Sequence, residues 1–107
     1  MVADVKTVNG VLSSYVAEVK KEMPIDKAYL FGSYAKGNPR ADSDLDVCFF
    51  SDYFEDKWVI DVGVKLLDIA RKYNKIIDIE PHTFATSELN DDNPFIQEIL
   101  RTGIELL

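Results

Sequence analysis

Two aspartates, Asp44 and Asp46, are separated by one residue inside a segment that otherwise has the composition of a β-strand. Side chains of a strand alternate between its two faces, so both carboxylates lie on one face while Leu45 and Val47 lie on the other. Aspartate is depleted from strands because it packs badly and its carboxylate is costly to desolvate. A chain with this strand must bury the apolar face and leave the acidic face open to a ligand.

A Gly-Ser pair precedes these acids at a defined spacing. Gly32-Ser33 ends a short apolar run, and ten residues separate Ser33 from Asp44. Glycine lets the backbone approach a phosphate closely, the following amides can form an anion-binding nest, and the Ser33 hydroxyl adds a donor. Lys36 and Arg40 could neutralise a leaving pyrophosphate, and a solvated loop explains them equally well. The combination predicts a divalent-metal site that faces a phosphate-binding turn.

A later apolar segment carries two more acids, Asp78 and Glu80, again separated by one residue. If residues 76–80 form a strand, these two carboxylates share a face. Mg²⁺ binds oxygen ligands, and a pair of ions can stabilise the attacking and leaving oxygens of an in-line phosphoryl displacement. A third carboxylate would complete the second ion's shell and could accept the nucleophile's proton. We assign this role to Asp78 and keep Glu80 as the alternative.

Helical and strand patterns alternate along the 107 residues, which predicts a single α/β domain over 1–107. The predicted architecture is a small mixed β-sheet with helices on one face and the acidic face open. The expected helices cover residues 4–22, a segment from Ser51 or Asp52 to about Asn74, and a segment opened by Asn93-Pro94 and closed by Gly103. The expected strands cover residues 27–31, 44–50, 76–80 and 104–107.

Composition excludes several classes of protein. A formal net charge of −7 argues against a protein whose main function is nucleic-acid binding, because such binding depends on Lys and Arg side chains that neutralise phosphates. The chain has neither a membrane-span pattern nor a signal-peptide pattern. The single Cys48 cannot form an internal disulfide, which favours a reducing cytoplasm. The only histidine, His82, is interpreted as a surface or strand-end residue rather than a ligand.

The segment from Leu30 to Val47 resembles the signature of the nucleotidyltransferase superfamily of the DNA polymerase β type. The short length and the order of elements are similar to the minimal nucleotidyltransferase (MNT) family, and this resemblance covers nearly the whole chain. It implies a nucleotidyltransferase fold, two Mg²⁺ ions as cofactors and ATP as substrate. On this resemblance the phosphate-binding pair is Gly32 and Ser33, the metal-binding acids are Asp44 and Asp46, and the third carboxylate is Asp78.

The resemblance also implies a partner. MNT proteins are commonly encoded beside a HEPN-domain protein, and characterised members act as antitoxins that transfer AMP from ATP to a tyrosine of the HEPN toxin. Two other functions stay open: an antitoxin that neutralises its partner by binding alone, and a nucleotidyltransferase that modifies a small molecule. The presence of all three acids and the Gly-Ser pair favours a working enzyme. Transfer to a small molecule is expected to need an acceptor domain, for which this chain has no room.

Overall fold

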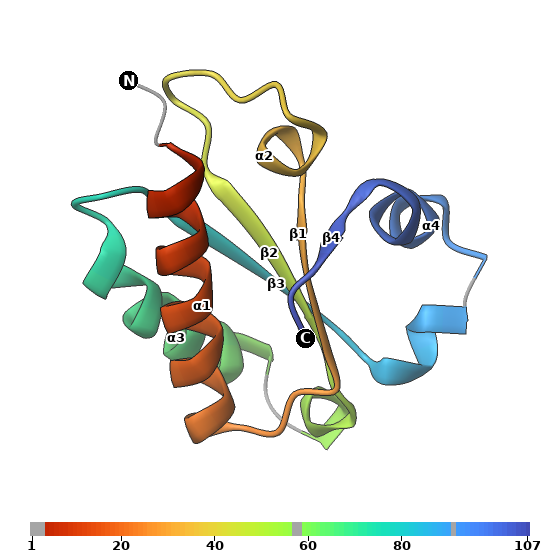
Figure 1. The fold of residues 1–107 in the computed structure, drawn as a ribbon. Coiled ribbons are helices and arrows are strands. Elements are labelled where there is room, and N and C mark those ends of the chain that lie inside the picture. Colours follow the sequence, from red (N-terminus) through yellow and green to blue (C-terminus); the bar gives the residue numbers. More distant parts are fainter. Residues whose placement is uncertain (1–3, 57–58, 91) are drawn as a thin grey trace.

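The computed structural model describes residues 4–56, 59–90 and 92–107, and its four-stranded sheet is flanked by helices (Figure 1). In chain order the elements are α1 (Val5–Glu22), β1 (Lys27–Phe31), α2 (Ser33–Lys36), β2 (Leu45–Phe50), η1 (Asp52–Asp56), α3 (Val59–Ala70), η2 (Arg71–Tyr73), β3 (Ile79–Phe84), η3 (Thr86–Asn90), α4 (Pro94–Thr102) and β4 (Ile104–Glu105). Among the described helices, none combines the length and the apolar character needed to cross a membrane. The mixed sheet and the fold class agree with the sequence prediction.

The sheet has the strand order β3-β2-β1-β4. β1 is antiparallel to both β2 and β4, while β2 and β3 are parallel. Phe31 at the end of β1 pairs with Asp46 near the start of β2, and Asp46 pairs with Glu80 near the start of β3. The end of β1 and the starts of β2 and β3 therefore meet at one end of the sheet.

The apolar face of β2 lies in the larger hydrophobic core, where Leu45, Val47 and Phe49 are fully buried. Helices α1 and α3 cover this face and lie side by side (Figure 1). The buried Tyr15 hydroxyl of α1 donates a 3.0 Å hydrogen bond to the Leu66 carbonyl of α3. Burial of these apolar side chains and the satisfied hydroxyl explain why both helices are held on this face.

Helix α4 packs on the opposite face, where it was not expected. Its buried Ile96 and Ile99 form a second hydrophobic cluster with Cys48 and Phe50 of β2. The prediction that all helices lie on one face is wrong for α4, because β2 is apolar on both faces beyond Asp46 and needs cover on both. Asp46, on the same face of β2 near its start, stays partly exposed. Cys48 is a free, buried thiol, as expected for a small apolar residue.

The ends of α4 lie where the sequence signals predicted them. The Asn93 side chain accepts a 2.9 Å hydrogen bond from the Phe95 backbone N–H, and Pro94 occupies the first helical position. Gly103 ends the helix, and the chain continues directly into β4 beside β1.

The second and third predicted strands are shifted in the structure. β2 begins at Leu45 rather than Asp44, and β3 covers Ile79–Phe84 rather than 76–80. Pro81 was expected to end the strand, but β3 lies at the edge of the sheet, where a missing N–H needs no partner. Ile76, which was expected to begin this strand, donates its backbone N–H to the Tyr73 carbonyl and so belongs to a turn before β3.

The long helix predicted from residue 51 or 52 to about 74 is divided into three parts. A 3₁₀ turn (η1) precedes α3, and a second 3₁₀ turn (η2) follows it up to Tyr73. Residues 57 and 58, which fall within the predicted helix, lie outside the described residues.

We expect Gly103→Ala to destabilise the fold by about 1–3 kcal/mol through overpacking. A Cβ at this position would overlap the Ile99 carbonyl oxygen and lie 3.0 Å from the Leu30 carbonyl oxygen, and neither backbone can move freely. Urea unfolding measures the effect. Gly10→Ala is the matched control, because Gly10 lies on the exposed side of α1 and a Cβ there meets nothing within 4 Å. It should stabilise by about 0.5–1 kcal/mol. Equal effects in both variants would contradict the packing argument.

Candidate functional site

Gly32 joins β1 to α2 and lies against Asp46 of β2. Its backbone has φ +77° and ψ −155°, a conformation that residues with a Cβ rarely adopt. A Cβ on Gly32 would overlap Asp46 Oδ2 and lie 3.3 Å from Asp46 Cγ. The strand register explains this approach, since Phe31 is the Cα partner of Asp46. Glycine is therefore required at position 32 by the backbone conformation and by the space that the carboxylate occupies.

The ten residues after Ser33 form a one-turn helix and a closing loop. Gly37 ends α2 in the left-handed conformation, with φ +80°. In the loop that follows, the Arg40 backbone N–H donates a 2.8 Å hydrogen bond to Ser43 Oγ. The chain then returns to Asp44 at the start of β2. The spacing seen in the sequence is thus the length needed to bring the second strand back beside Gly32.

Four carboxylates gather where β2 and β3 begin. Asp46 and Glu80 are Cα partners in the parallel ladder, so they lie side by side. Asp44 and Asp78 immediately precede these strands, and the Leu45 backbone N–H donates to the Asp78 carbonyl at 2.9 Å. The structure therefore brings together all four acids singled out in the sequence, with Glu80 directly beside Asp46 and Asp78 next to the start of β2.

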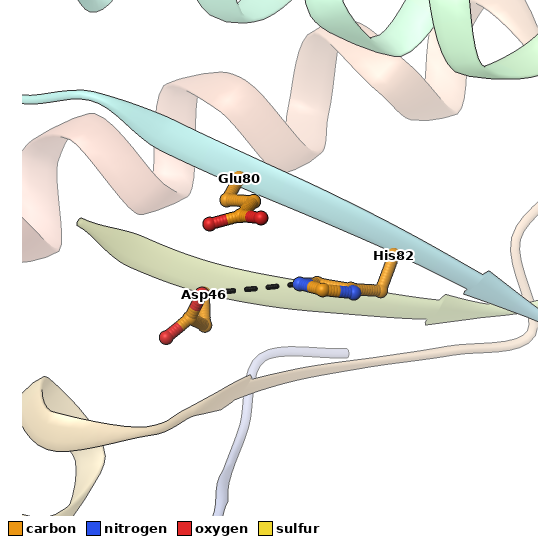
Figure 2. Close-up of side chains that lie close together, drawn as sticks. All are labelled: Asp46, Glu80 and His82. Atoms are coloured by element: carbon orange, nitrogen blue, oxygen red, sulfur yellow. Dashed lines mark ion pairs between the residues drawn. The ribbon is translucent and has the colours of Figure 1, made fainter.

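His82 is the residue of this site that the sequence interpretation missed. It lies two positions after Glu80 on the same face of β3, and its Nε2 is 3.8 Å from Asp46 Oδ1 (Figure 2). One ligand atom from each of Asp46, Glu80 and His82 lies within 4.8 Å of the other two. The period-2 pattern of positions 78, 80 and 82 would have revealed it, had the strand been extended past Pro81.

Burial and like charge raise the pKa of Asp44 and of Asp46. Burial raises the pKa of Asp44 above its ordinary value, and the neighbouring Asp78 and Glu80 carboxylates raise it further. Burial and then the Glu80 carboxylate raise the pKa of Asp46, while His82 opposes this rise. Both shifts show that negative charge is unfavourable here without a cation, which is the electrostatic condition of a metal site.

Two cavities adjoin the carboxylates, and both are lined by Asp44, Asp78 and Asn74. The larger, of about 320 Å³, extends along α3 to Leu67 and also includes Glu80. The smaller, of about 200 Å³, includes Tyr34 and the loop residues before Asp44. Asp44 and Asp78 are therefore accessible from both the α3 side and the loop side.

The two candidate cations lie apart from this cluster. Lys36 is exposed and forms a 3.4 Å ion pair with Glu98 of α4. Arg40 lies in the exposed loop. In the part of the chain that the structure describes, no ion pair joins either cation to the carboxylates. Their predicted contact with a pyrophosphate stays a prediction.

A sequence profile of the family described as "Polymerase beta, Nucleotidyltransferase" matches residues 15–107. This chain is a polymerase beta-type nucleotidyltransferase. The matched residues include the Gly32 turn and all four carboxylates of the site. The comparison with curated proteins found no match.

Solved structures share the fold of this nucleotidyltransferase at low sequence identity. A toxin–antitoxin structure with AMP-PNP aligns with a TM-score of 0.61 and 17% identity, covering 89% of this chain and 72% of the other. A mutant of the MntA–HpeT toxin–antitoxin has the same TM-score and coverage at 15% identity. A protein from Sulfolobus solfataricus, described as a nucleotidyltransferase, aligns with a TM-score of 0.59 and 16% identity, covering 98% of this chain and 89% of the other.

We expect Asp44→Asn to raise the melting temperature by a few degrees at pH 7 when divalent ions are chelated. A carboxyl whose pKa is raised by folding stabilises the folded state below its unfolded pKa, about 3.9, and loses this effect as the pH rises. The amide of the variant carries no charge, so it avoids both the burial of a charge and the repulsion from Asp78 and Glu80. The gain in melting temperature should therefore shrink towards about pH 4, where the parent carboxyl is increasingly protonated.

Thermal melts across this pH range, with Asp92→Asn as the control, test this expectation. Asp92 is exposed and precedes α4, so its amide removes the same formal charge away from the cluster. A destabilised Asp44→Asn variant, or an equal gain from Asp92→Asn, would contradict the proposed repulsion.

Proposed function

We propose that this nucleotidyltransferase transfers AMP from ATP to a tyrosine hydroxyl of a HEPN-domain toxin and thereby acts as its antitoxin in the cytoplasm. The observation that carries the proposal is the approach of the Gly32 backbone to Asp46, beside the four carboxylates. The turn that would bind a phosphate through its backbone amides thus lies directly beside a cluster of acids that would bind a cation. That is the arrangement required for a metal-bound triphosphate.

The residues present fit a divalent metal. The donors include carboxylates at the starts of β2 and β3, and burial, followed by neighbouring negative charge, raises the pKa of Asp44 and Asp46. One ligand atom from each of Asp46, Glu80 and His82 lies within 4.8 Å of the other two. Asp44 and Asp46 would hold Mg²⁺, and an acid at the start of β3 would complete the set of ligands. When bound, two Mg²⁺ ions would neutralise the triphosphate and stabilise the attacking and leaving oxygens.

The chain's own residues would bind the nucleotide and move the proton. The backbone amides that follow Gly32 would bind a phosphate, and the Ser33 hydroxyl can donate a hydrogen bond to it. Lys36 and Arg40 would need to leave their present surroundings to reach the pyrophosphate.

A carboxylate oxygen of the third acid would accept the proton of the attacking hydroxyl. The sequence favoured Asp78 for this role, and Asp78 lies close enough to raise the pKa of Asp44. The strand register supports Glu80 more directly, because Glu80 is the Cα partner of Asp46 and is one of the three clustered ligands. We propose Glu80 as the third acid and keep Asp78 as the alternative.

The partner assignment rests on the resemblance and on the toxin–antitoxin proteins that share this fold. One of them was solved with AMP-PNP, an ATP analogue, which supports ATP as the nucleotide. Another carries two aspartate-to-glutamate substitutions with one residue between them, the same spacing as Asp44 and Asp46. An AMP group on the toxin adds negative charge and bulk, which would oppose RNA phosphates at a ribonuclease site.

We expect Asp44→Asn and Asp46→Asn each to lower AMP transfer below about 1% of the parent rate while the protein stays folded.

Glu80→Gln should lower turnover by about 100-fold or more, with a smaller loss of ATP affinity, because the proton is transferred in the transition state. Asp78→Asn should cost less. Transfer of radiolabelled AMP and ATP binding by calorimetry are the measurements, with Asp92→Asn as the control. A larger loss in Asp78→Asn than in Glu80→Gln would return the third-acid role to Asp78.

The partner is tested with the HEPN-type protein encoded beside this chain, incubated with ATP and Mg²⁺. We expect intact-mass analysis to show one or more AMP groups on a tyrosine of that protein, together with loss of its ribonuclease activity. An Asp44→Asn/Asp46→Asn double variant should neither add AMP nor neutralise at equal concentration. If the double variant neutralises as well as the parent does, the protein acts by binding alone. AMP found on a small molecule instead would support the third alternative.

A further inference from the structure

His82 has an unusual environment for the only histidine of the chain. Its ring lies edge-on against Phe31, with 5.0 Å between the ring centroids. Its Nε2 is enclosed by protein and has no hydrogen-bond partner, although the rest of the side chain is partly exposed. A buried ring nitrogen without a hydrogen bond costs free energy, so this atom is suited to bind a ligand.

This nitrogen points to the carboxylates and lies within ion-pair distance of Asp46 (Figure 2). The 3.8 Å between His82 Nε2 and Asp46 Oδ1 is too long for a hydrogen bond. Two atoms that each lie about 2.1 Å from one ion are separated by about 3–4 Å, so this distance suits two ligands of a shared metal. Glu80 supplies the third donor, and all three ligand atoms lie within 4.8 Å of one another.

We propose that His82 is a nitrogen ligand which, with Asp46 and Glu80, makes this metal position prefer a first-row transition ion such as Mn²⁺ over Mg²⁺. The inference rests on the metal site of the proposed function and specifies its ion. Mg²⁺ takes oxygen ligands almost exclusively, whereas imidazole nitrogen favours the transition ions. An all-carboxylate site would show no such preference for a nitrogen-binding ion.

The strand places His82 in this role without further movement of the backbone. Positions 46 and 48 of β2 pair with 80 and 82 of β3, so the imidazole starts one step along the sheet from the Asp46–Glu80 pair. The contact with Phe31 limits rotation of the ring and holds Nε2 towards the acids. The ligand set therefore combines one imidazole and two carboxylates from two adjacent strands.

The single histidine makes a direct test possible. Tag-free protein is loaded with Mn²⁺ alone, and its electron spin echo envelope modulation spectrum is recorded. We expect modulation from one imidazole nitrogen, which can come only from His82, and we expect His82→Gln to abolish it. Mn²⁺ bound without nitrogen modulation would overturn the inference, as would failure of Mn²⁺ to bind at millimolar concentration.

Metal selectivity gives a second, independent measurement. By calorimetry, His82→Gln should weaken Mn²⁺ binding at least tenfold and change Mg²⁺ binding less than threefold. Thr83→Val is the matched control, because Thr83 is the next residue of β3 and points to the other face. It should leave both affinities unchanged. Equal losses for the two ions in His82→Gln would show that His82 only positions Asp46.

The outcomes separate this inference from the proposed function. AMP transfer that proceeds with Mg²⁺ while Mn²⁺ shows no nitrogen modulation would leave the function intact and refute the ligand assignment. Nitrogen modulation and Mn²⁺ selectivity without transfer of any nucleotide would support the metal site and refute the proposed function.

Discussion

The packing of the Gly32 backbone against the Asp46 carboxylate is the constraint on which the rest of this site depends. It requires a glycine with positive φ at position 32, a defined β1–β2 register, and a loop long enough to return the chain beside it. A slip of one residue in that register would turn Asp46 into the core and bring Val47 to the site. The Gly32 turn and strand β2 are thus one structural unit, because neither can move without the other.

Strand β2 serves both the core and the site. Leu45, Val47 and Phe49 are buried beneath α1 and α3, which holds the strand in place. On the other face the side chains change from Asp46 at the open end to Cys48 beneath α4. Apolar burial over most of the strand offsets the repulsion among the acids at its start. A small domain can hold a highly charged site in this way because the charge is confined to one end of the sheet.

Local signals predicted much of this arrangement. The spacing of Gly32-Ser33 and Asp44 reflects covalent connectivity, and the ends of α4 follow from its capping residues, so a single sequence contains that information. The sheet face that α4 covers could not be predicted, because helical periodicity shows which side of a helix is apolar but not where that side packs. The assignment of this face depends on a hydrophobic cluster that includes Ile96 and Cys48, which are distant in sequence.

The third strand shows the same limit. Pro81 indicates the end of a strand in isolation, and only the position of β3 at the sheet edge makes it tolerable. A predicted strand that ends at residue 80 separates His82 from the acids with which it shares a face of β3. The partners of a residue in a sheet depend on strand order, which is a property of the whole fold.

Pro81 also bears on how the molecule avoids unwanted self-association. A free edge of a parallel strand is a template on which strands from other chains can pair and aggregate. Pro81 removes one amide donor from that edge in the middle of β3, beside the buried Val47 of β2. Pro81 thus interrupts the row of hydrogen bonds that a strand from another molecule would need to pair with β3. An acidic site open at a sheet edge can remain accessible to its ligands without exposing a continuous surface for fibril growth.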